Sequence, residues 1–469
     1  MGLKIEGKVE KVNGKELSYA EFVEKYLDKN QPVILTGLTD DWRARKDWVS
    51  GDGKPNLRFF SDQFGGSRVQ VADCAKREFT DQKRLEMSVS EFIEIWINSS
   101  NSDNGGADGK PLLYLKDWHF VKEYPDYVAY STPVFFRDDW LNLYLDEYHM
   151  HDDPETYRER NEVNCSDYRF VYMGAKGTWT PLHADVFRSY SWSANVCGRK
   201  QWYFLCPSQH HLVFDRYMKS AVYNIFEDVC KSKYPGFEEA VWLECTQERD
   251  EIIFVPSGWY HQVHNLEDTI SINHNWFNAY SISWVWGLLL REYHEAAGYI
   301  EDLKDICDDF EVLCQRNLAA NAGMDFRDFF IFLFRFSLAN FLLLYQITSS
   351  KGFLHWCSSE AARFLLFNLK SIKCITLQMK SEAGWQNCGF AAIDLVETIE
   401  DPAFMDFYNT LGIAYSMMYN FSEIDFSESR NILEHEQISV LYPFGSHICN
   451  PDNLITFLGN AFKLVGTEG

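Results

Sequence analysis

Two stretches decide the fold of this chain: residues 180–185, which read Thr-Pro-Leu-His-Ala-Asp, and residues 255–261, which read Val-Pro-Ser-Gly-Trp-Tyr-His. The first follows the apolar segment 168–173 and a glycine-containing loop, a pattern typical of two strands joined by a turn. In an extended segment, side chains two positions apart point to the same side. The imidazole of His183 and the carboxylate of Asp185 can therefore reach one metal ion, and a third ligand must come from elsewhere.

Three histidines compete for the third position: His261, His264 and His274. We expect segments 260–265 and 269–276 to be strands that pair as a hairpin. One face of this hairpin carries His261, Val263, Ser271, Asn273 and Asn275, and the other carries His264, Ile270, Ile272, His274 and Trp276. Both faces contain a histidine, so alternation alone does not choose. The serine and the two asparagines suggest a polar barrel interior, which favours His261.

Two histidines and one carboxylate form the facial triad that binds non-haem Fe(II) and leaves positions open for a bidentate 2-oxo acid and dioxygen. A zinc hydrolase is the chemical alternative, although zinc more often takes a tetrahedral site with one water. A second triplet, His151-Asp152-Asp153, lies in the acidic run 146–155 and is interpreted as part of a solvated loop.

Lys200 lies in the predicted strand 200–205, on the same side as Trp202 and Phe204. An ammonium group buried on such an aromatic face needs an anion, since desolvating the charge alone is costly. The functional interpretation is that Lys200 binds the far carboxylate of a dicarboxylic cosubstrate. The alternative is a lysine at the edge of the sheet, with its ammonium group in water.

Short strands separated by glycine turns indicate an all-β sandwich or barrel between about residues 110 and 280. A hairpin of segments 190–196 and 200–205 is expected within it. Helical periodicity precedes this region at 18–27 and 88–97 and follows it at 292–313 and 326–347. We therefore expect a mainly β core with flanking helices, an α+β fold. Its three parts are an N-terminal segment 1–110, a catalytic β domain 111–280 and a C-terminal helical region 281–469.

Charge and composition narrow the function classes. The 469 residues include 44 basic and 68 acidic side chains, a net charge of −24, which argues against nucleic-acid binding and favours a basic peptide or protein as partner. The 12 cysteines include no Cys-x-x-Cys pair, so they predict reduced thiols in a cytoplasmic or nuclear protein. The charged N-terminus has no apolar signal segment.

One apolar segment, 329–347, raises the membrane question, but it contains Arg335 and Asn340, which are costly in hydrocarbon. It predicts a buried core helix, and no membrane association is expected.

The order of these features resembles the JmjC (jumonji) family of Fe(II)- and 2-oxoglutarate-dependent oxygenases. The resemblance rests on stretch 180–185, Lys200, stretch 255–261 and Asn275, and it spans about residues 114–277. Segment 32–38 also looks like the family's entry segment, whereas nothing is recognised beyond about residue 345. The resemblance implies a double-stranded β-helix, that is, a cupin-like jelly roll.

Carried over by position, the resemblance implies that His183, Asp185 and His261 bind iron and are the catalytic centre. It implies that the 2-oxoglutarate pocket contains Tyr114, Thr180, Lys200, Asn273 and Asn275. Thr180 and Lys200 would hold the C5 carboxylate, and Tyr114 could also reach it or be a packed core tyrosine. In this family, 2-oxoglutarate and dioxygen give succinate and carbon dioxide while a substrate carbon is hydroxylated.

Within the family, stretches 188–200 and 261–276 look closest to the lysyl hydroxylases that act on the eukaryotic translation termination factor. The resemblance thus implies a protein substrate, with lysine of that release factor as the expected target. A JmjC histone lysine demethylase and a non-catalytic β-helix scaffold are the alternatives. A homodimer through the helices after Tyr280 is also expected, as in several JmjC hydroxylases.

Overall fold

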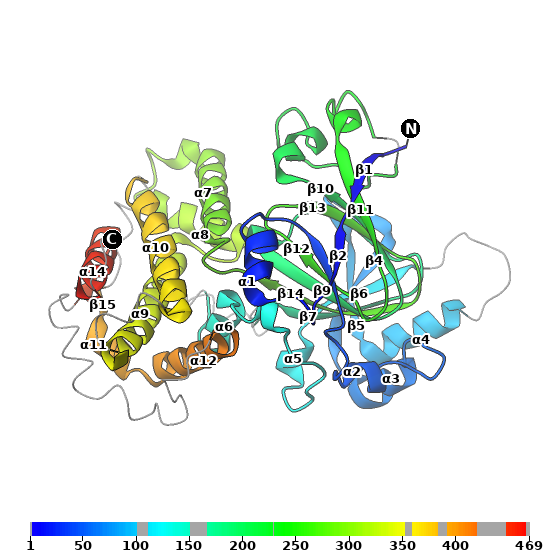
Figure 1. The fold of residues 1–469 in the computed structure, drawn as a ribbon. Coiled ribbons are helices and arrows are strands. Elements are labelled where there is room, and N and C mark those ends of the chain that lie inside the picture. Colours follow the sequence, from blue (N-terminus) through cyan, green and yellow to red (C-terminus); the bar gives the residue numbers. More distant parts are fainter. Residues whose placement is uncertain are drawn as a thin grey trace. The chain divides into compact units, whose positions relative to one another are not determined.

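The computed structural model describes residues 2–100, 111–150, 167–227, 229–351, 359–382, 392–419 and 447–465. The chain divides into two compact units, shown in Figure 1. Unit 1 consists of Met1–Pro133 and Asp167–Trp276, and unit 2 consists of Val134–Ser166 and Phe277–Gly469. Unit 1 holds both large sheets and unit 2 is helical. The division into segments 1–110, 111–280 and 281–469 stays a prediction.

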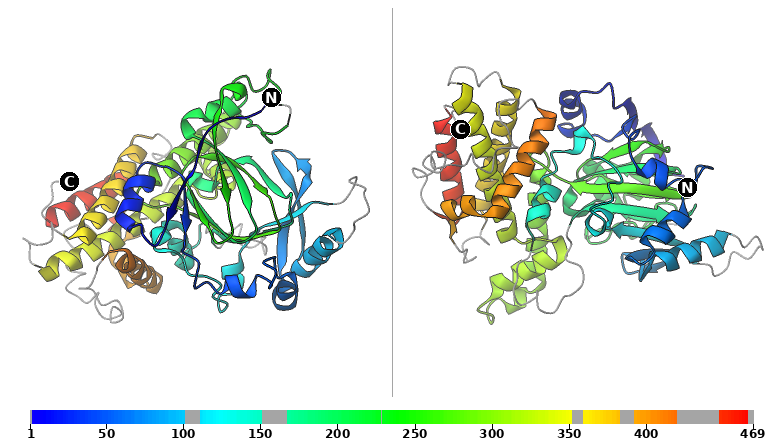
Figure 2. Two further views of the ribbon diagram at one scale, coloured as in Figure 1. Left: turned by 45° about the vertical axis from the view of Figure 1, so that its right-hand side comes forward. Right: turned by 90° about the horizontal axis from the view of Figure 1, so that it is seen from below.

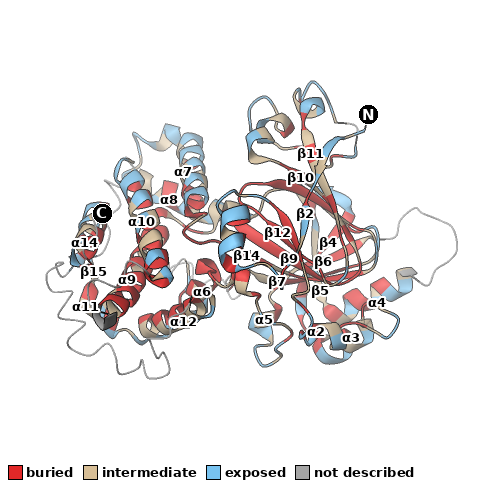
Figure 3. Cartoon of the chain, in the orientation of Figure 1, coloured by how far each residue is buried: buried red, intermediate tan, exposed pale blue. Residues whose placement is uncertain are grey.

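Two β-sheets form the centre of unit 1. The five-stranded sheet has the order β1 (Lys4–Lys8), β11 (Val241–Gln247), β10 (Lys200–Leu205), β13 (Tyr260–Asn265) and β8 (Trp179–His183). The nine-stranded sheet has the order β2 (Glu10–Asn13), β3 (Val33–Thr36), β12 (Ile252–Val255), β9 (Tyr190–Cys197), β14 (Thr269–Trp276), β7 (Arg169–Gly174), β6 (Leu113–Trp118), β4 (Arg68–Glu78) and β5 (Asp81–Ser88). Strands β9, β12 and β14 are almost entirely buried (Figure 3).

Strands β7 to β14 form the barrel. Four of them, β7, β9, β12 and β14, lie in the nine-stranded sheet, and β8, β10, β11 and β13 lie in the other. Neighbours among these eight strands are antiparallel, and the left view of Figure 2 shows the two sheets as facing layers. Eight antiparallel strands in two layers make a jelly roll. The expected α+β fold with a double-stranded β-helix core is therefore confirmed.

Both expected hairpins are wrong. Strands β9 and β10 follow each other in the chain but lie in opposite sheets, and so do β13 and β14. On β13, His261 pairs with Phe204 of β10 and His183 of β8, rather than with β14. The short turns cross from one layer to the other, so the inward faces of consecutive strands oppose each other across the barrel. Alternation along a strand predicts its faces but not its partner.

Helices and short helical turns flank the sheets of unit 1. They are α1 (Tyr19–Phe22), the π-helical turn η1 (Val23–Leu27), α2 (Ala44–Asp47), α3 (Leu57–Phe64), α4 (Val89–Ser100), α5 (Phe120–Glu123) and the 3₁₀ turns η3 (Val186–Arg188), η4 (Pro207–Val213) and η5 (Phe237–Glu239). A capping box of Ser18 and Glu21 begins α1. The helical segments expected at 18–27 and 88–97 are confirmed.

Unit 2 is built from helices. They are the 3₁₀ turn η2 (Val134–Phe136), α6 (Trp140–Glu147), α7 (Ile282–Tyr299), the 3₁₀ turn η6 (Glu301–Leu303), α8 (Phe310–Ala322), α9 (Phe326–Lys351), α10 (Glu360–Lys380), α11 (Leu395–Glu400), α12 (Pro402–Met418) and α14 (Pro451–Leu464), with the short strands β15 (Ile393–Asp394) and β16 (His447–Ile448). The single helix expected over 292–313 is wrong, because α7 ends at Tyr299 and α8 begins at Phe310.

Helix α9 is long and apolar enough to cross a membrane by length and composition, with a mean hydropathy of 1.7 in its most apolar part. However, 78% of that part is buried inside the structure. Its polar groups are bonded within unit 2: Asn340 accepts from Asn368, and Arg335 donates to the hydroxyl of Tyr144 at 2.6 Å. Helix α9 is therefore the buried core helix that the sequence predicts.

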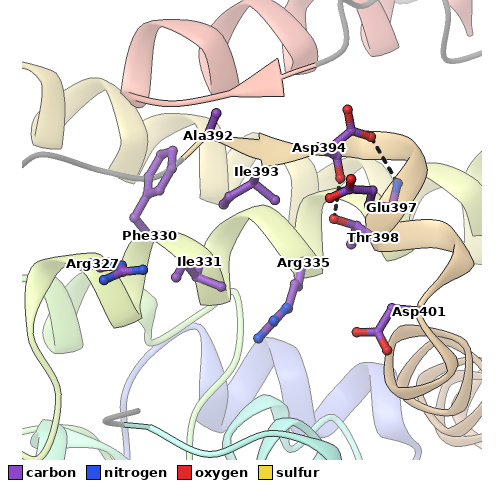
Figure 4. A pocket seen from close by; sticks show the side chains of 10 residues that line it. All are labelled: Arg327, Phe330, Ile331, Arg335, Ala392, Ile393, Asp394, Glu397, Thr398 and Asp401. Carbon is purple, nitrogen blue, oxygen red and sulfur yellow. Dashed lines mark hydrogen bonds between the residues drawn. The ribbon is translucent and has the colours of Figure 1, made fainter. Parts of the chain in front are cut away.

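A cavity of ≈ 300 Å³ lies in unit 2, between α9 and the segment that leads into α11 (Figure 4). Arg327 and Arg335 line one side, and Asp394, Glu397 and Asp401 line the other. Two of these carboxylates cap helices, because Asp394 accepts from backbone N–H groups of α11 and Asp401 accepts from one of α12. The cavity contains no histidine or cysteine and is not the metal site.

Gly198, in the crossing between β9 and β10, provides a test of this topology. It has φ +77°, and a Cβ atom there would lie 2.3 Å from the Asp268 carbonyl oxygen. Gly177 has a similar φ of +92°, but no heavy atom of the described residues lies within 4 Å of its Cβ position. We expect Gly198→Ala to lower the free energy of unfolding in urea by more than about 2 kcal/mol, and Gly177→Ala by only about 1 kcal/mol. Equal losses would contradict the tight crossing.

Candidate metal and cosubstrate site

The structure brings together the three side chains that the sequence singles out as metal ligands. Ligand atoms of His183, Asp185 and His261 all lie within 4.8 Å of one another. His183 at the end of β8 is directly opposite His261 on β13, and their ring centroids are 4.2 Å apart. Asp185 follows two residues after His183. Two imidazoles and one carboxylate thus converge on one point.

The two competing histidines lie elsewhere. The His264 ring stacks on Trp179 with centroids 5.7 Å apart, and its Nε2 is 2.9 Å from the amide nitrogen of Gln262. His274 Nε2 is 2.5 Å from the hydroxyl of Tyr130. The choice of His261 therefore agrees with the geometry, although the hairpin used to reach it is wrong. The triplet that begins at His151 lies outside the described residues.

Backbone carbonyl groups orient both imidazoles. Nδ1 of His183 is 2.8 Å from the Pro181 oxygen, and Nδ1 of His261 is 3.1 Å from the Trp259 oxygen. A proton on each Nδ1 satisfies these bonds and leaves Nε2 as the metal-binding atom. Burial, reinforced by the neighbouring His261, lowers the pKa of His183 to about 4. His183 is therefore a neutral imidazole, the form that binds a metal.

A bulge in β8 places Thr180 on the same face as His183. His183 pairs with His261 and Thr180 pairs with Val263, so three steps along β8 match two steps along β13. Strict alternation would put Thr180 and His183 on opposite faces. Pro181 lies in this bulge. Proline has no N–H group, and at a bulge no hydrogen bond between the strands requires one.

The opposite sheet holds the carboxylate ligand in place. Ser191 of β9 donates from Oγ to Asp185 Oδ2 at 2.7 Å, which leaves Oδ1 for a metal. The chain between them includes Phe187 and Arg188, both with positive φ, at 55° and 52°. Arg188 donates to the Tyr260 hydroxyl at 2.9 Å, next to His261 in the chain. These bonds tie the segment after β8 to both sheets.

Lys200 is buried, with 2% of its surface exposed. Its Nζ donates to Ser271 Oγ at 2.7 Å and to Tyr114 Oη at 3.3 Å. Within the part of the chain that the structure describes, no carboxylate pairs with it. Burial, with a smaller effect of Lys116, lowers the pKa of Lys200 to about 7. The edge-lysine alternative is therefore wrong, and the ammonium group lies where an incoming anion would neutralise it.

The other expected cosubstrate residues lie along the same interior. Tyr114 is buried and contacts Lys200, and Asn273 donates to Ser271 Oγ at 3.1 Å. Asn275 lies further along β14 and donates to Ser189 Oγ at 3.3 Å. The positions of Tyr114 and Asn273 agree with a pocket around Lys200, whereas Asn275 lies two residues beyond Asn273, toward Ser189.

Sequence reasoning missed several interior polar residues. Lys116 of β6 is buried with 2% exposure, and Ser191 orients Asp185. Three further interior oxygens have no hydrogen-bond partner among the described residues: Ser193 Oγ, Asn195 Oδ1 and Asn265 Oδ1. The alternation of Ser191, Ser193 and Asn195 along β9 is the signal that could have revealed the polar residues of that strand.

This donor set fits Fe(II) and a 2-oxo dicarboxylic acid. Two imidazoles and one carboxylate on one side of a metal leave adjacent positions open. Lys200 and the hydroxyl groups of Ser271 and Tyr114 offer a cation and hydrogen bonds for a distal carboxylate. Buried oxygens without partners are consistent with a cavity that is completed by ligand or water.

Comparisons with known proteins point in the same direction. A family model described as a cupin-like domain matches residues 19–282. The chain is 56% identical over 460 residues to the arginine-specific demethylase JMJ20 of Arabidopsis thaliana, with 98% of each chain covered. It is 42% identical over 323 residues to the 2-oxoglutarate and iron-dependent oxygenase JMJD4 of Danio rerio, covering 68% of this chain and 72% of the relative. The human protein of that name is 34% identical over 338 residues, covering 71% and 77%.

The hydrogen bond to Asp185 gives a first test of the site. We expect Ser191→Ala to weaken Fe(II) binding by about 10–100-fold in anaerobic titration, because the carboxylate loses its orienting donor. Ser193→Ala is the matched control: it lies two residues along the same strand, and its buried Oγ has no hydrogen-bond partner in the part of the chain that the structure describes. The control should change the affinity by less than about twofold. Similar losses in both variants would rule out a specific role of Ser191.

Proposed function

Because this chain belongs to the cupin-like JmjC family of oxygenases, we propose that it is an Fe(II)- and 2-oxoglutarate-dependent protein hydroxylase. The observation that carries the proposal is the cluster of His183, Asp185 and His261 within 4.8 Å, in the same barrel as the buried Lys200. Packing alone accounts for neither the converging triad nor the buried Lys200. A catalytically silent scaffold would need neither a converging triad nor a lysine buried without a carboxylate.

When bound, Fe(II) and 2-oxoglutarate supply the oxidative chemistry, in which the 2-oxo acid becomes succinate and carbon dioxide and one oxygen atom enters a substrate C–H bond. The protein supplies the geometry. His183, Asp185 and His261 would hold the metal. Lys200, with Ser271, would hold the distal carboxylate of the cosubstrate by charge and hydrogen bonding.

Aromatic walls shield the histidine side of the site. The rings of Trp202 and Phe204 have centroids 5.6 and 5.7 Å from that of His261, and both residues are buried. Such walls exclude bulk water and strengthen the attraction between Lys200 and a carboxylate. They also keep the oxidising step away from solvent, so turnover is directed to the substrate.

The proposed substrate is a lysine of the translation termination factor. Support comes from stretches 188–200 and 261–276, which look closest to the lysyl hydroxylases of that factor. Those stretches include the metal ligand His261, Ser191, which donates to Asp185, and Arg188, which donates to Tyr260 beside His261. The net charge of −24 favours a basic substrate segment.

Arginine demethylation is the second candidate, because the relative that is 56% identical along nearly the whole chain is named an arginine-specific demethylase. The two reactions share the oxidation step. Hydroxylation of an N-methyl carbon gives an unstable product that loses formaldehyde, whereas hydroxylation of a side-chain carbon gives a stable alcohol. The substrate therefore decides between them.

We also propose a cytoplasmic location. The nine cysteines of the described residues are all free thiols, which is consistent with a reducing compartment. The homodimer through the helices after Tyr280 stays a prediction.

Mass spectrometry of peptide products separates the two candidates. With Fe(II), 2-oxoglutarate and a lysine-containing termination-factor peptide, we expect the gain of one oxygen atom. With peptides that carry methylated arginine or methylated lysine, we expect no loss of a methyl group and no formaldehyde. If the methylarginine peptide lost a methyl group while the termination-factor peptide gained no oxygen, arginine demethylation would replace lysyl hydroxylation as the proposed activity.

Succinate release tests the metal site itself. We expect the double variant His183→Ala plus Asp185→Ala to lose at least about 10³-fold of the succinate release measured with substrate, because only one ligand remains. The His264→Ala variant removes a histidine outside the cluster and should retain most of it. Succinate release that persists in the double variant would show that the reaction does not take place at this metal site.

The pKa of Lys200 predicts proton uptake on cosubstrate binding. In the free protein burial lowers this pKa to about 7, so at pH 8 the amine is mostly neutral. A bound carboxylate favours the ammonium form, so binding takes up protons, and the Kd for 2-oxoglutarate should rise by up to about tenfold per pH unit above pH 7. Calorimetry at pH 8 in buffers of different ionisation enthalpy measures the uptake. Lys200→Met should reduce it, and zero uptake in the wild type would contradict the assignment.

A further inference from the structure

A second lysine is buried on β6, the neighbour of the barrel strand β7, and the function proposed above does not use it. Lys116 has 2% of its surface exposed and follows Tyr114 by two positions on β6, so both side chains point to the same side of the strand. Its Nζ donates to Gln82 Oε1 at 3.0 Å. Over the described ranges of the chain, no carboxylate lies within ion-pair distance of it. The charge is therefore buried against a neutral amide.

Contacts place Lys116 beside the cosubstrate pocket. Its Nζ is 5.2 Å from the centroid of the Tyr114 ring, and the hydroxyl of Tyr114 accepts from Lys200. Gln82, which accepts from Lys116, donates from Nε2 to the Trp179 carbonyl oxygen at 3.0 Å. Trp179 immediately precedes Thr180. Lys116 thus lies beside Tyr114, which could reach the C5 carboxylate, and is linked through Gln82 to the residue before Thr180, which is expected to hold that carboxylate.

Nearby carboxylates are engaged with another cation. Arg84 pairs with Asp117 at 3.0 Å and with Asp81 at 3.3 Å, and the Tyr172 hydroxyl donates to Asp117 at 2.6 Å. A lysine kept only for packing would be expected to share one of these acids, because an unpaired buried charge destabilises a fold.

The charge of Lys116 also acts on Lys200. Burial lowers the pKa of Lys116 to about 8, and the charge of Lys116 adds to the effect of burial on Lys200. When both amines are protonated they repel each other, and over the described residues neither pairs with a carboxylate. The distal carboxylate of an entering dicarboxylic acid would place a negative charge against both amines.

We infer that Lys116 is a second cationic contact of the cosubstrate, so that the C5 carboxylate of 2-oxoglutarate is bound between the ammonium groups of Lys116 and Lys200. This inference rests on the proposed function, since it assigns a further residue to the same cosubstrate. It predicts that the two ammonium groups make the pocket selective for 2-oxo acids that carry a second carboxylate. The competing interpretation is that Lys116 has only a structural role, in which it donates a hydrogen bond to Gln82.

Calorimetric binding to the Mn(II)-loaded protein tests the inference without turnover. We expect Lys116→Met and Lys116→Gln each to weaken 2-oxoglutarate binding by at least about tenfold. Their Mn(II) affinity without cosubstrate should be unchanged or higher, because a positive charge near His183 is removed. Lys176→Met, which removes an exposed lysine, is the matched control and should change cosubstrate binding by less than about twofold.

A cosubstrate lacking the distal carboxylate identifies the group that Lys116 contacts. With 2-oxovalerate, which has the same carbon chain but no C5 carboxylate, the Lys116 variants should bind as the wild type does. An equal loss with both ligands would overturn the assignment to the C5 carboxylate. Binding of 2-oxoglutarate within about twofold of wild type in both variants would overturn the inference entirely.

Folding and function are separated by two readouts. Thermal melting by circular dichroism should show Lys116→Met at or above the wild-type melting temperature, because a buried unpaired charge is gone. Lys116→Gln, which keeps a hydrogen-bonding group, serves if the methionine variant does not fold. Failure of the wild-type Mn(II) protein to bind 2-oxoglutarate would instead contradict the proposed function.

Discussion

The interior of the barrel in unit 1 is charged and polar, and the rest of the site depends on that constraint. Two imidazoles, one carboxylate and two ammonium groups lie in an interior that is otherwise well packed, and among the described residues no carboxylate pairs with either lysine. Burying such groups without partners costs several kcal/mol each. The cost would be reduced when a divalent cation binds the imidazoles and the carboxylate and when the distal carboxylate of a cosubstrate lies against the two ammonium groups. The site is therefore shaped for ligands before they arrive.

The jelly roll solves the geometric part of the problem. Because consecutive strands cross between layers, both sheets supply groups to the same space. His183 and His261 come from neighbouring strands of one sheet, and the opposite sheet supplies Ser191, which holds Asp185. Lys200 likewise reaches across to Ser271. The Ser191–Asp185 and Lys200–Ser271 hydrogen bonds each join the two layers. The bonds that orient the site residues therefore also hold the two sheets together.

Part of this arrangement could be predicted from the sequence, because local alternation determines which residues share a face of a strand. That rule found Asp185 beside His183, the aromatic side of Lys200 and the polar interior that favours His261. It could not find the strand partners, since pairing is a long-range choice, and both expected hairpins were wrong for that reason. It also missed the bulge at Pro181, because a bulge is defined by the pairing of its strand with the neighbouring strand. Lys116 gave no signal of its own, because its meaning depends on neighbours distant in the sequence, such as Gln82.

The most direct test of the central claim is an anaerobic titration of the protein with Fe(II) followed by 2-oxoglutarate, monitored by the visible absorption that a bidentate 2-oxo acid produces on Fe(II). The account predicts that this absorption appears in the wild type and in His264→Ala, and that it is absent or greatly weakened in His261→Ala. An unchanged band in His261→Ala, or an equal loss in both histidine variants, would contradict it.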